Sequence, residues 1–189
     1  MNTTSNYTTQ NQLLLNNLME FYKNESYLTR MLKIITGESK ISLRIVDWFA
    51  TNYAKKNYTL YPIEDSGGNI IRFKVYFDYK LKLKAYSKKR FDPFCRWERT
   101  SIPYKNETCI ETTIGQLNFF KWAIENRVIE YIEENYDTIE KDMNSRNSTS
   151  KRKETIVDNS KTRKKREELS VSATKSIKKE EVEIVVQFH

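Results

Sequence analysis

Apolar residues in the first part of the chain recur near helical spacing. They follow steps of three and four residues between Leu14 and Ile35, and Gly37 is a natural helix end in the left-handed conformation. The pattern predicts one amphipathic helix, or two helices broken near residues 24–26.

A further helix is predicted over the following residues. Ser39 or Ser42 can serve as its N-cap, with Ile45, Trp48 and Phe49 on one side. The string ISLRIVDWF is also compatible with a buried strand, because β-branched and aromatic residues suit both structures.

The middle of the chain carries the pattern of a β-hairpin and a long strand. The string TLYPI is separated by EDSGGN from IIRFKVYFDY, and the turn residues 67–69 tolerate positive φ. Apolar and polar residues alternate from Phe73 to Ala85, so we expect one face in the core and one wet, basic face. A turn at residues 87–90 and a break at Asp92-Pro93 then lead into a strand around residues 94–102.

The last ordered element is predicted to be a long helix. Thr112 or Thr113 can cap it, because Gln116 stands three residues after Thr113 as in a capping box. Apolar residues then recur at three- and four-residue steps from Leu117 to Tyr136.

These elements predict an α+β fold, with a small antiparallel sheet, helices packed on one face, a long C-terminal helix and then a disordered basic tail. Of the 24 aromatic residues, 23 precede residue 145. We therefore expect a disordered N-terminus over residues 1–10, a single α+β domain over residues 11–144 and a disordered basic tail over residues 145–189.

Positive charge is concentrated in one stretch. Residues 72–99 hold ten Lys or Arg against three Asp or Glu, a net charge of +7 in a chain of net charge +8. A basic face on an otherwise acidic body confines attraction to polyanions to one side. On the predicted strand, Lys80, Lys82 and Lys84 would lie on one face about 7 Å apart, comparable to the phosphate spacing of a single strand. The alternative is that these lysines only protect an exposed sheet from aggregation.

Lysine and arginine neutralise phosphates, and exposed rings stack on unpaired bases. The predicted nucleic-acid contacts are Lys80, Lys82, Lys84, Lys88, Lys89, Arg90, Arg96 and Arg99, with Tyr76 and Tyr86 as stacking rings.

The sequence offers little to a catalytic or metal-based mechanism. The only histidine is the terminal His189, and Cys95 and Cys109 form no CxxC pair, so we expect free thiols. No Gly-rich phosphate loop is present. We predict no catalytic residue, no metal site and no cofactor.

One enzymatic alternative remains. A metal-dependent nuclease needs two or three converging carboxylates and a lysine. Asp47, Asp78 or Asp92 with Glu98 are the candidates, although no spacing signals such a site.

Two basic clusters of the tail resemble a two-part nuclear localisation signal. They are Lys151, Arg152 and Lys153, followed by Lys161, Arg163, Lys164, Lys165 and Arg166. A polyanion-binding arm and a solubilising tail are the alternatives. No apolar run approaches the roughly 20 residues of a spanning helix, so no membrane partner is expected.

Three strings carry a resemblance: SLRIVDWFATNYAKKN, YKLKLKAYSKKRFDPFCRWER and ETTIGQLNFFKWAIENRVIEYI. They resemble a small uncharacterised protein family of large nucleocytoplasmic DNA viruses, the mimivirus-like giant viruses. The similarity covers residues 38–146. It implies a viral source and carries no activity or catalytic residue over to this chain.

Basic surface and resemblance together predict a non-enzymatic viral nucleic-acid-binding protein acting in gene expression or genome packaging. The alternatives are a virion structural or adaptor protein that binds an acidic protein partner, and a metal-dependent nuclease-like enzyme. The expected location is the viral factory in the host cytoplasm or the virion, or the nucleus through the basic tail. Whether the partner is DNA or RNA, and the oligomeric state, are left open.

Overall fold

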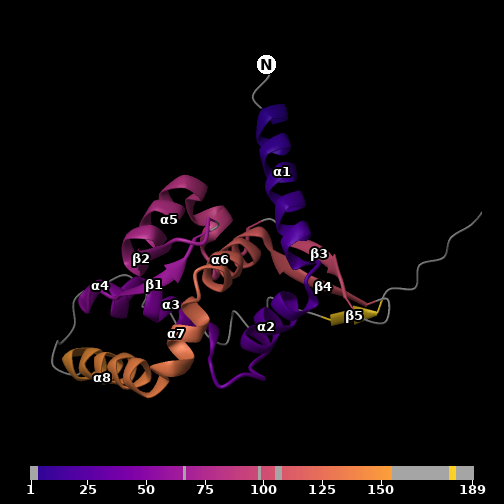
Figure 1. Cartoon of the computed structure of the whole chain (residues 1–189). Coiled ribbons are helices and arrows are strands. Elements are labelled where there is room, and N and C mark those ends of the chain that lie inside the picture. Colours follow the sequence, from indigo (N-terminus) through magenta and orange to yellow (C-terminus); the bar gives the residue numbers. More distant parts are fainter. Residues whose placement is uncertain (1–3, 66, 98, 105–107, 155–178, 182–189) are drawn as a thin grey trace, which may run out of the picture.

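The computed structural model describes residues 4–65, 67–97, 99–104, 108–154 and 179–181 (Figure 1). Its helices are α1 (Thr4–Tyr22), α2 (Glu25–Thr36), α3 (Leu43–Trp48), the π-helix η1 (Phe49–Tyr53), α4 (Ala54–Lys56), α5 (Val75–Phe91), α6 (Ile114–Glu125), α7 (Val128–Glu134) and α8 (Tyr136–Glu154). Its strands are β1 (Leu60–Glu64), β2 (Ile70–Lys74), β3 (Arg99–Pro103), β4 (Thr108–Thr113) and β5 (Lys179–Glu181). The predicted α+β class is confirmed.

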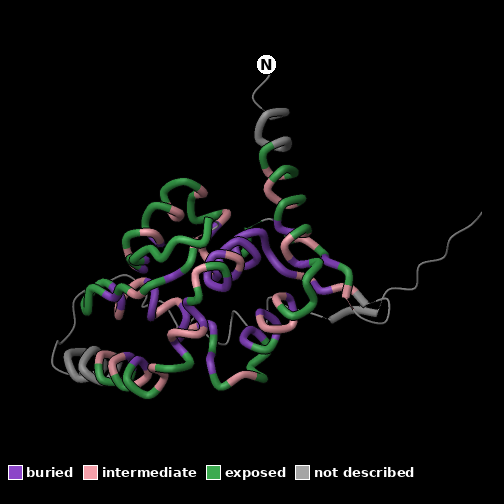
Figure 2. The backbone as a smooth tube through the Cα atoms, viewed as in Figure 1, coloured by how far each residue is buried: buried purple, intermediate pink, exposed green. Residues whose placement is uncertain are grey.

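Helix α6 lies at the centre of the fold. Ten of its 12 residues are buried, and α1, α5, α7 and β4 pack around it (Figure 2). A helix that is buried on all sides must be apolar all round, as α6 nearly is. Its start follows the predicted signal: the Thr113 side chain accepts a hydrogen bond of 3.2 Å from the Gln116 backbone N–H.

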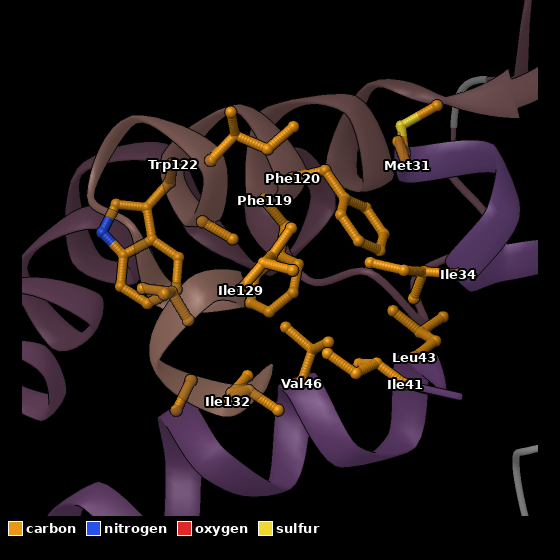
Figure 3. Packing of buried hydrophobic residues seen from close by; sticks show 14 of the residues in the cluster. Met31, Ile34, Ile41, Leu43, Val46, Phe119, Phe120, Trp122, Ile129 and Ile132 are labelled. Atoms are coloured by element: carbon orange, nitrogen blue, oxygen red, sulfur yellow. The ribbon is translucent and has the colours of Figure 1, made fainter. Parts of the chain in front are cut away.

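The hydrophobic core joins the N-terminal and C-terminal helices (Figure 3). Phe119 and Phe120 of α6 are fully buried, and Ile129 of α7 continues this core. Met31 of α2 and Val46 of α3 meet them from the N-terminal half. Segments about 80 residues apart in the sequence therefore form one core.

The N-terminal region consists of two helices, which confirms one of the two predicted alternatives. Asn24 caps α2 by accepting a hydrogen bond of 3.0 Å from the Ser26 backbone N–H, and Gly37 ends it with φ of 80°. α1 begins at Thr4, so the residues described before position 11 are helical rather than irregular. They had shown no apolar periodicity because this end of α1 extends away from the core (Figure 1).

The segment after Gly37 is helical, so the alternative of a buried strand is wrong. Ser42 caps α3, with its hydroxyl accepting a hydrogen bond of 3.3 Å from the Ile45 backbone N–H. The helix continues through η1 into α4 and ends near Tyr58, whose φ is 48°.

β1 and β2 form the predicted antiparallel hairpin, with Leu60 opposite Lys74. Asp65 holds its turn by accepting hydrogen bonds from the backbone N–H groups of Gly67 at 2.8 Å and Asn69 at 2.9 Å. Gly68 supplies the positive φ, at 79°.

A second antiparallel sheet has the strand order β3-β4-β5. The strand predicted around residues 94–102 is present only from Arg99 onward, as β3.

The strand predicted from Phe73 to Ala85 is wrong beyond Lys74: residues 75–91 form helix α5. Leu, Lys and Ala, which are strong helix formers, make up eight of these 17 residues, whereas Val75 is the only β-branched one. Val75 and Tyr79 are buried, and the half-buried Leu83 and Tyr86 continue their helical spacing toward α6. The alternation of Lys and Leu therefore resembled a strand, although Val75, Tyr79, Leu83 and Tyr86 form the apolar face of a helix.

The helical stretch predicted after Thr113 is present as three consecutive helices. α6 ends before Arg127, whose φ is 54°, and α7 ends at Asn135. α8 then continues to Glu154, ten residues past the predicted domain boundary at 144. β5 also lies in the segment predicted as tail, and the other residues after 154 are outside the described part of the chain. No described helix is both long and apolar enough to cross a membrane.

Candidate functional site

The basic residues predicted to bind nucleic acid lie mostly on α5. Lys80, Lys82, Lys84, Lys88, Lys89 and Arg90 belong to this helix, Arg96 follows it in a loop, and Arg99 begins β3. Six of the eight predicted cations therefore lie on one helix instead of a strand, while Arg96 and Arg99 lie on the loop and the strand that follow it.

Three lysines line the outer side of α5. Lys80, Lys84 and Lys88 are exposed, and none of them forms an ion pair with another described residue. Lys80 and Lys84 are four residues apart, which is about 6 Å along a helix axis. The predicted straight track through Lys82 is wrong, because two residues turn a helix by roughly 200° and Lys82 is half-buried.

The other predicted cations have protein partners or are partly covered. Lys89 Nζ lies 3.8 Å from the centroid of the Trp97 ring, and the Arg99 guanidinium pairs with Glu111 at 3.0 Å. Arg90 is half-buried, and its carbonyl accepts a hydrogen bond of 2.8 Å from Asn118 Nδ2. These residues are less available to a ligand than the three exposed lysines.

A kink divides the basic surface. Ser87 has φ of 64° and ψ of 167°, which interrupts α5 between Lys84 and Lys88. The predicted turn at residues 87–90 is thus seen as a single non-helical residue within the helix.

Tyr76 and Tyr86, the predicted stacking rings, are both packed against the core. Tyr86 stacks on the buried Phe91 with ring centroids 6.0 Å apart and an interplanar angle of 19°. Lys55 Nζ lies 5.6 Å from the centre of the Tyr76 ring. Neither ring is free on both faces, so neither can hold a base alone.

The aromatic rings that are exposed belong to different residues, which the sequence pattern did not indicate. Tyr58 is 78% exposed, Phe77 60% and Trp97 48%. Phe77 was expected in the core from its place in the alternation. Read at helical spacing instead, Phe77 falls opposite Val75 and Tyr79, a signal that would have placed it outside.

A pocket of about 420 Å³ lies beside the first turn of α5. The ends of α4, β1 and β2 meet α5 here, and the lining residues are Ala54, Lys55, Tyr58, Thr59, Leu60, Lys74, Tyr76 and Phe77. The lining combines apolar and aromatic side chains with two lysines and contains no carboxylate.

The carboxylates that were candidates for a nuclease metal site do not line this pocket. Asp78 accepts a hydrogen bond of 2.6 Å from Trp122 Nε1, and Asp92 accepts one of 2.9 Å from the Phe94 backbone N–H. Burial raises the pKa of Asp47 to about 7, and the negative charge of Asp92 adds to this. Within the described residues, no three His, Cys, Asp or Glu side chains gather as metal ligands, and Glu98 lies outside them.

Cys95 and Cys109 are free, half-buried thiols, as the sequence indicated. Of the two basic tail clusters, residues 151–153 belong to the end of α8, while residues 161–166 and the terminal His189 lie outside the described chain.

Comparisons with known proteins place the chain among viral relatives. It is 47% identical over 148 residues to an uncharacterized protein of Acanthamoeba polyphaga mimivirus. This match covers 76% of the chain but only 56% of the mimivirus protein, so the chain spans little more than half the length of that relative. No solved structure matches the fold.

A family model matches residues 1–188, almost the whole chain. Its description is that of a family of unknown function, and the mimivirus relative agrees with the giant-virus family that the three sequence strings resemble. The chain therefore belongs to this family of unknown function (DUF7197).

Proposed function

We propose that the protein is a non-enzymatic viral nucleic-acid-binding protein that contacts phosphates through the outer side of α5. The observation that carries the proposal is the pair Lys80 and Lys84 on one side of α5, with Lys88 just beyond the kink; all three are exposed and unpaired among the described residues. Because no described carboxylate forms an ion pair with these lysines, they are available to an external polyanion. Binding phosphates there would release counterions, which is the main source of sequence-independent affinity.

The surroundings of α5 favour a polyanion on this side. Asp78 is the only acid within α5, and its carboxylate is held by Trp122 of the core. The glutamates of α7 lie elsewhere, where Glu130 and Glu133 bind Arg30 of α2. Asp78, Glu130 and Glu133 are therefore engaged by protein partners, whereas Lys80, Lys84 and Lys88 are not, so a polyanion would be attracted to α5.

The role we propose for such binding is in viral gene expression or genome packaging. The viral factory, the virion or the nucleus would be the site of action. The phosphate contacts alone do not distinguish DNA from RNA, because they position a strand without reading its sequence.

The test is a charge reversal with a matched control. The full chain carrying K80E and K84E is compared with one carrying K33E and K141E, two exposed lysines far from α5 that also form no ion pair among the described residues. Both variants change the net charge by the same amount, so overall attraction to polyanions changes equally.

Affinity for DNA and RNA, single- and double-stranded, is measured by fluorescence anisotropy over a salt series. Loss of two single-strand phosphate contacts should reduce the salt slope by about 1.4 and weaken binding far more in the α5 variant than in the control. Equal weakening in both variants, or none, would overturn the proposal.

A second candidate function rests on a different observation. Leu81 is 65% exposed on α5 and Ile70 is 78% exposed on the hairpin, and aliphatic side chains beside lysines suit an acidic protein partner. The protein would then be a virion structural or adaptor protein. A stoichiometric complex with one viral protein that survives nuclease treatment would favour this function over nucleic-acid binding.

A further inference from the structure

We propose that the pocket beside the first turn of α5 binds an unpaired nucleobase, which makes the protein a single-strand binder. This inference rests on the proposed function and adds to it a site and a class of nucleic acid. The pocket volume of 420 Å³ falls within the roughly 300–1,000 Å³ typical of small-ligand sites.

The pocket is built on backbone that is held in place. Thr59 N–H donates a hydrogen bond of 3.1 Å to the Ala54 carbonyl, and Val75 N–H donates one of 3.3 Å to the Thr59 carbonyl. These two bonds fix the segment after α4 to the start of α5. The rings of the pocket are therefore carried by elements whose relative position is set.

Tyr58 ends the helix as its left-handed C′ residue, a position that is usually glycine or asparagine. Its φ of 48° is left-handed, which is unfavourable for a bulky residue, and its side chain is 78% exposed. The helix end therefore holds an exposed ring at the pocket, where the ring can contact a ligand.

The lining matches the chemistry of a base with its phosphates. Tyr58, Tyr76 and Phe77 provide rings, and the rings of Tyr76 and Phe77 meet edge to face at 6.2 Å and 73°. Flat, uncharged aromatic groups stack on such rings. Lys55 and Lys74 stand at the same pocket, where they can pair with the phosphates on either side of the base.

The pocket continues into the proposed phosphate contacts. Phe77 is followed on the same helix by Lys80 at three residues and Lys84 at seven, a spacing that keeps them on the outer side of α5. A strand whose base enters the pocket can thus continue along the exposed lysines. A base inside a duplex cannot enter a pocket without leaving its stack, so single strands are favoured.

The experiment compares strands that differ only in their bases. Binding of the full chain is measured to oligothymidylate, to an abasic strand with the same number of phosphates, and to a duplex of the same length. We expect the base-containing strand to bind about tenfold more tightly than the abasic strand, in line with base–aromatic stacking.

Two variants and a control locate the effect. F77A and L81A remove side chains of similar exposure from the same helix, but only Phe77 lines the pocket. We expect F77A to abolish the preference for bases and L81A to keep it. Y58G should also lose the preference while unfolding at no lower urea concentration, because glycine relieves the left-handed strain.

Several outcomes would overturn the inference. Equal affinity of the wild type for abasic and base-containing strands would mean that the pocket holds no base, as expected if it received an apolar side chain of a protein partner. Salt-dependent binding that K80E and K84E abolish would in that case leave the proposed function standing. Loss of the preference in L81A as well would also contradict the pocket.

Discussion

Trp122 Nε1 donates a hydrogen bond of 2.6 Å to the Asp78 carboxylate, which joins the central helix α6 to the first turn of α5. Trp122 is 3% exposed, while Asp78 is half-buried. The only carboxylate of α5 is thereby used to attach the helix to the core. The same contact orients the helix so that its lysines face outward.

The bond between Trp122 and Asp78 predicts a clear loss of stability in D78A. The variant leaves a buried indole N–H without its charged acceptor, which should lower the free energy of unfolding by about 2 kcal/mol. Urea denaturation measures this change. D137A is the control, because Asp137 and Lys40 form an exposed pair at 3.4 Å that contributes only a few tenths of a kcal/mol, roughly. Similar losses in both variants would contradict the role of Asp78.

The half-buried carboxyl of Asp47 predicts that the protein loses stability as the pH rises toward 7. Burial raises its folded-state pKa to about 7 from an ordinary value of 3.8, so the folded state holds the proton more tightly than the unfolded state. The stability contributed by the neutral carboxyl is complete below pH 3.8 and is lost as the pH passes through 7.

D47N removes this titration, so its free energy of unfolding should depend less on pH. Between about pH 5 and pH 8, the wild type should lose up to roughly 3 kcal/mol relative to D47N. Urea unfolding of both proteins at the two pH values measures the difference, and the contributions of other groups cancel in the comparison. Parallel pH profiles would show that Asp47 titrates normally.

The close approach of α6 to the end of α5 predicts that G115A is destabilised. A Cβ atom at Gly115 would lie 2.7 Å from the Asp92 carbonyl oxygen and 3.3 Å from that of Lys89. Because both neighbours are backbone atoms, one helix must shift, at a cost of about 1–3 kcal/mol in unfolding free energy.

G67A is the control for G115A. A Cβ atom at Gly67 would meet only the side chains of Asn69 at 3.2 Å and Asp65 at 3.3 Å, in an exposed turn. These contacts are with side chains and require shifts of only a few tenths of an ångström, so the expected loss is a few tenths of a kcal/mol, roughly. A cost for G115A no larger than that for G67A would show that the contact is loose.

Local signals in the sequence were sufficient where one residue determines the backbone. Ser42 and Thr113, each one of two predicted candidates, cap their helices, and Gly37 ends α2. In each case the side chain, or its absence, acts on backbone atoms within a few residues.

The alternation of apolar and polar residues predicted the wrong element where a strand period and a helix period coincide. From Val75 to Tyr86, apolar residues lie at both two-residue and three- to four-residue steps, so the pattern alone could not decide. The packing of Tyr79 and Phe91 against Phe119 and Trp122 favours the helix, and these contacts are long-range. Because of this error, Phe77 was expected in the core, whereas the structure places it on the surface.

The pocket could not be found from sequence at all. It brings together Tyr58, Leu60 and Lys74 with Phe77 through the end of one hairpin and the start of a helix. Nothing in the local sequence indicates that Tyr58 is left-handed, because Asn57 beside it tolerates that conformation better. The concentration of positive charge could be predicted from the sequence, whereas the position of the lysines beside exposed aromatic rings is evident only from the three-dimensional structure.

The kink of α5 predicts that S87G stabilises the protein. With φ of 64° and ψ of 167°, Ser87 occupies a region that is essentially restricted to glycine and costs other residues about 1–3 kcal/mol. Glycine also increases the entropy of the unfolded chain, so the expected net gain in unfolding free energy is about 1 kcal/mol. S87A, which keeps the Cβ atom and the strain, should gain nothing.

Urea denaturation of S87G and S87A separates strain from the loss of the hydroxyl. Because glycine accepts the existing backbone conformation, Lys84 and Lys88 keep their relative positions, and nucleic-acid affinity of S87G should stay within about twofold of the wild type. If S87G were instead less stable than S87A, the conformation at Ser87 would not be strained. The kink would then have to be maintained by the packing of Tyr86 and Phe91 on either side of it.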